Sequence, residues 1–202
     1  MTDLDSTLLQ LVLALFIFIA GLVLAVAVKG YFRAPLSRSV SLYLWHSLFC
    51  VIYLAYVLNY GGDASGYFRM SLRPDIDFAF GTYGVRFVVS FLSQGMGLSF
   101  LGCSLVFQLF GFIGLLAFDA ALREVTWDKS RNIRLLATFV VFLPSVSFWS
   151  SGLGKDSLSF CAMGLALWAA LSLKRRWVLL SVAVLLMLLV RPHMAGMLVL
   201  GP

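Results

Sequence analysis

The chain has 202 residues, of which 61% are hydrophobic and 12% charged, and its formal net charge is +6. A soluble domain holds roughly a quarter charged residues and about half apolar ones, so one water-soluble core could not bury this much apolar surface. The basic residues form short clusters between apolar runs, which is typical of membrane topology signals rather than of nucleic-acid binding. The composition therefore predicts an all-α, polytopic transmembrane helical bundle with a single domain over residues 1–202.

Apolar runs long enough to cross a membrane recur along the chain. About 20 apolar residues cross the hydrocarbon core as a helix, and shorter runs cross with the help of basic flanks or locally thinned lipid. The sequence predicts six spans, at residues 8–28, 39–60, 98–118, 135–150, 157–173 and 177–190.

The segment between the second and third predicted spans, residues 61–93, is expected to form an extracytoplasmic loop with a short interfacial helix at residues 64–72. An amphipathic or re-entrant piece follows, and residues 94–97 (QGMG) break it from the third span. The chain ends at residue 202 partway into another apolar segment, so we expect a fragment of a longer protein.

The distribution of Lys and Arg predicts the orientation. With the N-terminus outside, ten of the 15 basic residues fall in cytoplasmic segments and five outside. Basic residues resist translocation, so this split favours an extracytoplasmic N-terminus. The ten are Lys29, Arg33, Arg38, Arg123, Lys129, Arg131, Arg134, Lys174, Arg175 and Arg176.

Three polar stretches lie at predicted outer ends of spans, and the first begins at Asp63. A carboxylate shielded there from water could act as a general base; the alternative is an N-cap for the interfacial helix. Tyr67 could stack on a sugar ring or simply anchor the loop in the interface, and we add Arg69 as a basic substrate-binding residue.

The second polar stretch lies around Lys155. Gly152 and Gly154 interrupt the helix, and backbone amides freed in this way can form an anion-binding nest beside the Lys155 ammonium group. The alternative is an ordinary turn, with Asp156 placed favourably at the next helix N-terminus, where a lysine is disfavoured. We interpret Lys155 as a phosphate or diphosphate ligand and Asp156 as a helix-terminus residue.

The third stretch is Arg191-Pro192-His193. An arginine at the membrane border usually reaches to the interface, but with Lys155 on the same side Arg191 could hold a phosphate, and His193 could shuttle a proton. Asp75 and Asp77 could share a divalent cation with Asp63, although loop carboxylates are more often simply solvated. We predict no obligatory cofactor.

The stretch from Pro144 to Asp156, read as Pro-Ser-x-x-Phe-Trp-x-Ser-Gly-x-x-Lys-Asp, resembles bacterial polytopic proteins of envelope polysaccharide assembly. These are GT-C-type glycosyltransferases and oligosaccharide repeat-unit polymerase-like proteins. Arg191-Pro192-His193 is similar to their later basic-Pro-aromatic/His element, and Asp63 with Tyr67 looks like their acidic outer loop. The resemblance implies a polyprenyl-(di)phosphate sugar donor, an acid that activates the acceptor hydroxyl, and basic residues that hold the donor phosphate.

The sequence thus favours a membrane glycosyltransferase or polysaccharide polymerase of the bacterial inner membrane, with lipid, a lipid-linked sugar and other envelope-biosynthesis membrane proteins as partners and no nucleic acid. Two alternatives stay open: a transporter or flippase for such a lipid, and a non-catalytic membrane subunit. A transporter needs polar residues along a path through the midplane, where the sequence offers little beyond His46 and Gln108.

Overall fold

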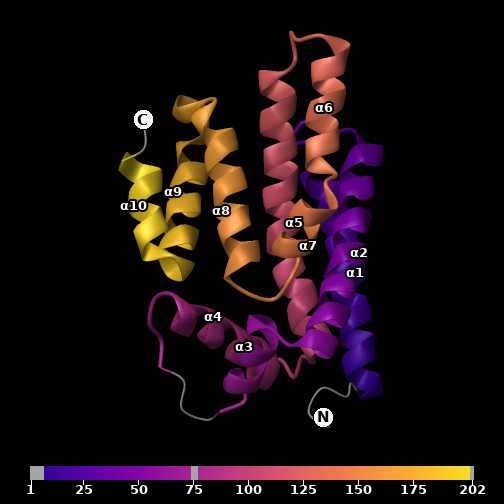
Figure 1. Ribbon diagram of the computed structural model, residues 1–202, viewed down its shortest axis with the longest axis vertical. Helices are drawn as coiled ribbons and strands as arrows, with labels where there is room; N and C mark the ends of the chain where they lie inside the picture. Colours follow the sequence, from indigo (N-terminus) through magenta and orange to yellow (C-terminus); the bar gives the residue numbers. More distant parts are fainter. Residues whose placement is uncertain (1–6, 74–76, 201–202) are drawn as a thin grey trace.

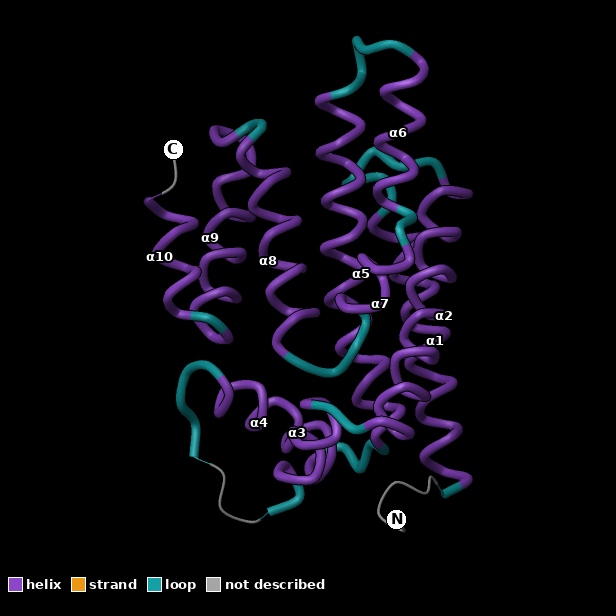
Figure 2. The backbone as a smooth tube through the Cα atoms, in the orientation of Figure 1, coloured by secondary structure: helices purple, strands orange, loops and turns teal. Residues whose placement is uncertain are grey.

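Helices form every regular element in the part of the chain that the structure, a computed structural model, describes: residues 7–73 and 77–200. Figure 1 shows long helices standing side by side, with two short ones lying across one end, and Figure 2 shows that most of the connections are short. The predicted all-α class is confirmed. The helices are α1 (Leu8–Val28), α2 (Leu36–Tyr60), α3 (Asp63–Ser71), α4 (Thr82–Ser90), the π-helical turn η2 (Phe91–Gly95), α5 (Phe100–Val125), α6 (Arg131–Val141), α7 (Pro144–Ser150), α8 (Lys155–Ala170), α9 (Leu173–Val190) and α10 (Pro192–Leu200).

Four helical segments are long and apolar enough to cross a membrane, which agrees with the predicted transmembrane protein: Leu8–Val28, Leu36–Tyr60, Phe100–Val125 and Arg131–Ser150. The first matches its predicted span. The second and third extend past their predicted ends through Arg38 and Asp119, because these two side chains pair with each other at 2.6 Å. A neutralised pair does not end a helix in the way that an isolated charge in lipid would.

The fourth segment is not one continuous helix. It is broken at residues 142–143 into α6 and α7, directly before Pro144, because proline disfavours the helical conformation in the residue that precedes it. The last two predicted spans correspond to α8 and α9. α8 has only 16 residues and α9 begins with three basic residues in its first turn, so neither belongs to the four crossing segments.

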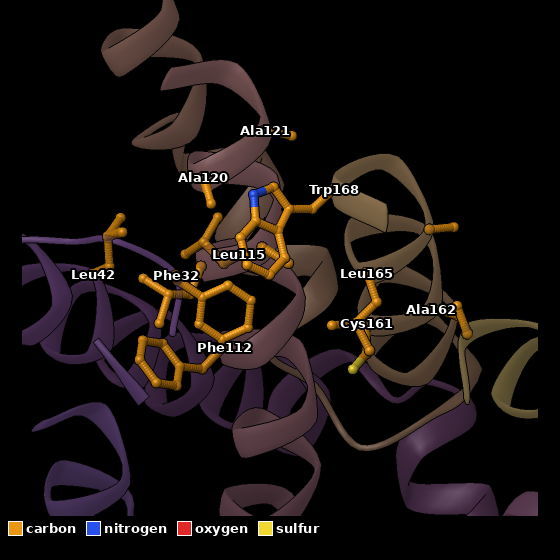
Figure 3. Close-up of a cluster of buried hydrophobic side chains, with 14 of the residues drawn as sticks. Phe32, Leu42, Phe112, Leu115, Ala120, Ala121, Cys161, Ala162, Leu165 and Trp168 are labelled. Atoms are coloured by element: carbon orange, nitrogen blue, oxygen red, sulfur yellow. The ribbon is translucent and has the colours of Figure 1, made fainter. Parts of the chain in front are cut away.

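Helix α5 forms the centre of the core and packs closely on α8. A Cβ atom added at Gly164 of α8 would lie 2.2 Å from the carbonyl oxygen of Gly114 in α5, so the two backbones touch where both residues lack side chains. Around this contact Phe112 and Leu115 pack with Trp168 in the largest buried cluster (Figure 3). Such close approach at small residues is the usual way in which helices associate in lipid.

Ion pairs tie the helices together at the end where the connections 29–35, 126–130 and 171–172 lie, which we call the basic end (top of Figure 1). Asp119 of α5 is fully buried and accepts hydrogen bonds from Arg38 of α2 and Arg123 of α5. Glu124 accepts one from Arg176 of α9 at 2.9 Å. The charges that mark topology in the sequence therefore also join α2, α5 and α9.

Candidate functional site

A polar cavity of about 420 Å³ lies at the opposite end of the molecule, where α3 and α4 pass across the ends of α8, α9 and α10. The three polar stretches of the sequence, separated by up to about 130 residues, meet in its wall. We call this the outer cavity. It is lined by Tyr53, Asp63, Tyr67, Gly81, Thr82, Trp149, Gly152, Leu153, Gly154, Lys155, Asp156, Val190, Arg191, Pro192 and His193.

Asp63 reaches the cavity because two glycines turn the chain sharply between α2 and α3. Gly61 and Gly62 have φ angles of 80° and 155°, which residues with a side chain rarely adopt. The interpretation of Asp63 as an N-cap is wrong: Gly62 is the cap residue, and Asp63 is the first residue of α3. Its side chain is exposed, so the expected shielding from water is absent, while its negative charge lies favourably at the positive end of the helix dipole.

Lys155 is the first residue of α8 and reaches across to α4. Its Nζ donates a hydrogen bond of 2.7 Å to Oγ1 of Thr82, the first residue of α4. Thr82 is neutral, and none of the ion pairs among the described residues includes Lys155, so its ammonium group has no carboxylate partner there. Lys155 therefore brings a full positive charge to the cavity wall and links α8 to α4.

The loop before Lys155 packs tightly against α2. A Cβ atom at Gly152 would lie 2.3 Å from the ring of Tyr53, so only glycine lets the loop follow this path. Within the described residues the backbone amides of residues 152–154 donate no hydrogen bond to backbone or side chain. Gly152 and Gly154 thus line the cavity next to unpaired amides, as an anion-binding nest requires.

Arg191 follows α9 and pairs with Asp156 in the first turn of α8. Sequence reasoning gave Asp156 only a role at the helix terminus and treated Arg191 as a free cation. The structure instead joins the two across the cavity wall, with about a third of the Arg191 side chain (36%) and 58% of that of Asp156 still exposed. An entering anion can therefore reach Arg191, but it must compete with Asp156. His193, in α10, also lines the cavity and is exposed.

Tyr67 lies in α3 and faces the cavity with only 8% of its surface exposed. Burial and the nearby carboxylates of Asp63 and Asp156 raise the pKa of its phenol, because both disfavour a phenolate. It is thus a neutral hydroxyl at physiological pH rather than an exposed membrane anchor. Arg69 is not among the lining residues: its Nε donates to the carbonyl oxygen of Ser65 in its own helix.

Sequence reasoning missed Thr82 and Tyr53, and it did not include Asp156 in the site. Thr82 follows a glycine in a long loop, with no spacing that would point to Lys155. Tyr53 lies within a predicted span, where an aromatic residue is unremarkable. Only the pair of Asp156 and Arg191 could have been found from the sequence. An acid and an arginine predicted on the same side of the membrane are expected to attract each other.

The possible metal site is not supported by the described residues. Asp75 lies outside them, and Asp77 is exposed and does not line the outer cavity. Among the residues that are described, no three His, Cys, Asp or Glu side chains come together in a way that could hold a metal ion.

The fold and the site together define a polytopic α-helical membrane protein with a charged cavity at one end of its helices. Comparison of the chain with protein-family models, with curated proteins and with solved structures finds no match.

Proposed function

We propose that the protein is an integral membrane glycosyltransferase or polysaccharide polymerase that uses a polyprenyl-(di)phosphate-linked sugar at the extracytoplasmic face. One observation carries the proposal: Asp63, Lys155 and Arg191 come from three distant segments and line the same cavity, at the end opposite to the basic connections. One acid and two cations in a membrane-surface cavity are the groups that glycosyl transfer from a phosphate requires.

In the proposed reaction Asp63 accepts the proton of an acceptor hydroxyl as its oxygen attacks the anomeric carbon of the donor. The bond between that carbon and the phosphate oxygen breaks, and the electron pair leaves with the (di)phosphate. Lys155 stabilises the charge that develops on this leaving group, assisted by the amides of Gly152 and Gly154. A phosphate is a good leaving group and needs little protonation, so His193 is not required as an acid.

The charges of the outer cavity are balanced in the absence of a ligand, and its two cations can bind an anionic one. Asp63 and Asp156 balance Lys155 and Arg191, so the site without ligand carries no large excess charge. When a phosphate approaches, its oxygens take the place of Asp156 on Arg191, and the planar guanidinium group can bind two of them at once. Asp156 is thereby released toward the solvent.

We also propose the finer topology: six crossings, with α8 and α9 among them, in the bacterial inner membrane, and an extracytoplasmic N-terminus. The connections that carry most of the basic residues lie together at the basic end, which favours a cytoplasmic location for that end. Labelling of single cysteines with a membrane-impermeant maleimide tests the orientation. We expect a cysteine at position 63 to react from outside and one at position 129 only after permeabilisation.

The catalytic proposal is tested by Asp63→Asn in the full-length protein. Membrane vesicles are supplied with a panel of polyprenyl-diphosphate monosaccharides, and transfer of labelled sugar is measured. Loss of a general base typically costs 10²–10⁴-fold in rate, so we expect transfer to fall by at least about a hundredfold. Asp77→Asn is the matched control, because it removes the same charge from the segment between α2 and α5, and Asp77 does not line the cavity. Full transfer by the Asp63→Asn protein would refute the role of this residue.

The alternative functions receive less support. His46 and Gln108, the polar residues of the midplane, are both fully buried and line neither the outer cavity nor those at the basic end. Gln108 donates to Ser47 at 3.0 Å, whereas neither ring nitrogen of His46 has a hydrogen-bond partner among the described residues. A transporter would need such groups along an open path. A non-catalytic subunit would not need its acid and its cations in one cavity.

A further inference from the structure

A second cavity, of about 340 Å³, lies between α5 and α6 at the basic end of the molecule, far from the outer cavity. Four arginines from three helices line it: Arg38 of α2, Arg123 of α5, and Arg131 and Arg134 of α6. The only carboxylate in its wall, among the described residues, is that of Asp119. We call it the arginine cavity.

The charges of the arginine cavity are not balanced by the protein residues that the structure describes. Both oxygens of Asp119 are already used, Oδ1 by Arg38 and Oδ2 by Arg123. Arg131 and Arg134 form no ion pair in the described part of the chain. The cavity therefore has a net charge of about +3, and an anion that binds in it would reduce the repulsion among these like charges.

The local helix does not offset this charge either. Arg131 is the first residue of α6, where the helix dipole is also positive, and the first turn of α6 contains no acidic residue. Two arginines at this position work against the stability of an isolated helix. An anion in the cavity would reverse that effect, because it interacts favourably with the dipole and with the guanidinium groups together.

The remaining walls of the arginine cavity identify the kind of anion. Leu122 and Leu135 line it beside the arginines, and Trp127 at its rim is 80% exposed. Below it the outward face of α6 continues with Leu136 and Phe139, which are 62% and 63% exposed in a segment that can cross the membrane. A free phosphate compound would gain nothing from the apolar face of α6. A phospholipid can place its headgroup among the arginines and its acyl chains along that face.

We propose that the arginine cavity binds the headgroup of an anionic phospholipid, with its acyl chains lying along the apolar face of α6. The phosphate lies between Arg131, Arg134 and the outer edge of Arg38, while Arg123, whose terminal nitrogens donate to the carbonyl oxygens of Phe32 and Arg33, contributes its charge. Arginine suits this role because its planar guanidinium group donates two parallel hydrogen bonds to phosphate oxygens. The site is independent of the outer cavity and of the glycosyl-transfer proposal.

The test uses the full chain in phosphatidylcholine nanodiscs, titrated with phosphatidylglycerol and followed by native mass spectrometry of bound lipid. The double variant Arg131→Gln/Arg134→Gln removes two charges from the arginine cavity without breaking an ion pair. We expect phosphatidylglycerol binding to fall by about thirtyfold, as two basic side chains near an anionic lipid would account for. The matched control is Lys174→Gln/Arg175→Gln, which removes the same charge from exposed residues at the same end but outside the cavity.

The two double variants distinguish a specific lipid site from a diffuse attraction between the basic end and anionic lipid. Selective loss in the α6 double variant, with binding in the α9 control within about threefold of wild type, supports the proposal. Equal loss in both variants would show a diffuse attraction and overturn it, as would unchanged binding in both. Displacement of phosphatidylglycerol by glycerol phosphate at equal concentration would instead identify a site for free phosphate. Arg131→Lys/Arg134→Lys keeps the charge but loses the paired hydrogen bonds of the guanidinium groups, so its binding should lie between that of wild type and that of the Gln double variant.

Discussion

Removal of the Asp119 carboxylate should destabilise the whole protein, because this one side chain joins helices that are far apart in sequence. It is fully buried and accepts three charge-assisted hydrogen bonds, at 2.6 and 2.9 Å from Arg38 and at 2.8 Å from Arg123. Breaking a buried ion pair by removing one partner typically costs about 3–5 kcal/mol, since the other charge is left unpaired. We therefore expect Asp119→Ala to lower the free energy of unfolding by about this amount.

The assay is thermal unfolding of the purified protein in detergent. For a chain of this length 1 kcal/mol shifts the melting temperature by roughly 2–4 °C, so Asp119→Ala should lower it by about 6–20 °C. Asp128→Ala is the control: Asp128 is exposed and, among the described residues, pairs only with its neighbour Lys129. Its loss should change the melting temperature little. A melting temperature for Asp119→Ala within about 2 °C of this control would refute the account of Asp119 as the junction of these helices.

Two further predictions concern packing and pH. Gly164→Ala should lower the free energy of unfolding by about 1–3 kcal/mol, because its Cβ would collide with the α5 backbone; Gly196→Ala, where the structure leaves open space, should be neutral or slightly stabilising in the same melting assay. The raised pKa of Tyr67 means that the folded state holds the phenolic proton more tightly than the unfolded state does. Stability should therefore fall as the pH rises above about 10, the usual pKa of a tyrosine. The melting temperature of Tyr67→Phe should fall less steeply with pH over this range. Equal slopes of melting temperature against pH for the two proteins would contradict the raised pKa of Tyr67.

The features of the fold that depend on composition could be predicted from the sequence. The run from Leu8 to Val28 contains no charge, and its helix begins and ends where the apolar residues do. Where charges lie near a helix end, prediction was less accurate. α5 continues for seven residues past its predicted end at residue 118, because Asp119 finds Arg38, a partner 81 residues away that no local pattern reveals.

Most of the predicted site residues line the outer cavity, although Arg69 does not, whereas the contacts within the site could not be predicted. The predicted alternation of the spans put Asp63, Lys155 and Arg191 on one side, and in the structure all three line the outer cavity. The partners of the two cations could not be predicted, because Thr82 comes from the long outer loop and Asp156 suits its helix terminus without any partner. Both contacts depend on how α4 and the end of α9 lie against α8, and only the three-dimensional structure gives that arrangement.

The contacts at the start of α4 link this helix to the wall of the outer cavity. The start of α4 is held by Lys155 through Thr82, and by a main-chain hydrogen bond of 2.8 Å from Gly81 to the carbonyl oxygen of Leu189 in α9. A ligand that draws the lysine toward itself removes the first of these contacts, and α4 then stays in place through the second and through Val85 and Val89, which are fully buried. The occupancy of the outer cavity is therefore linked to the contact between α8 and α4.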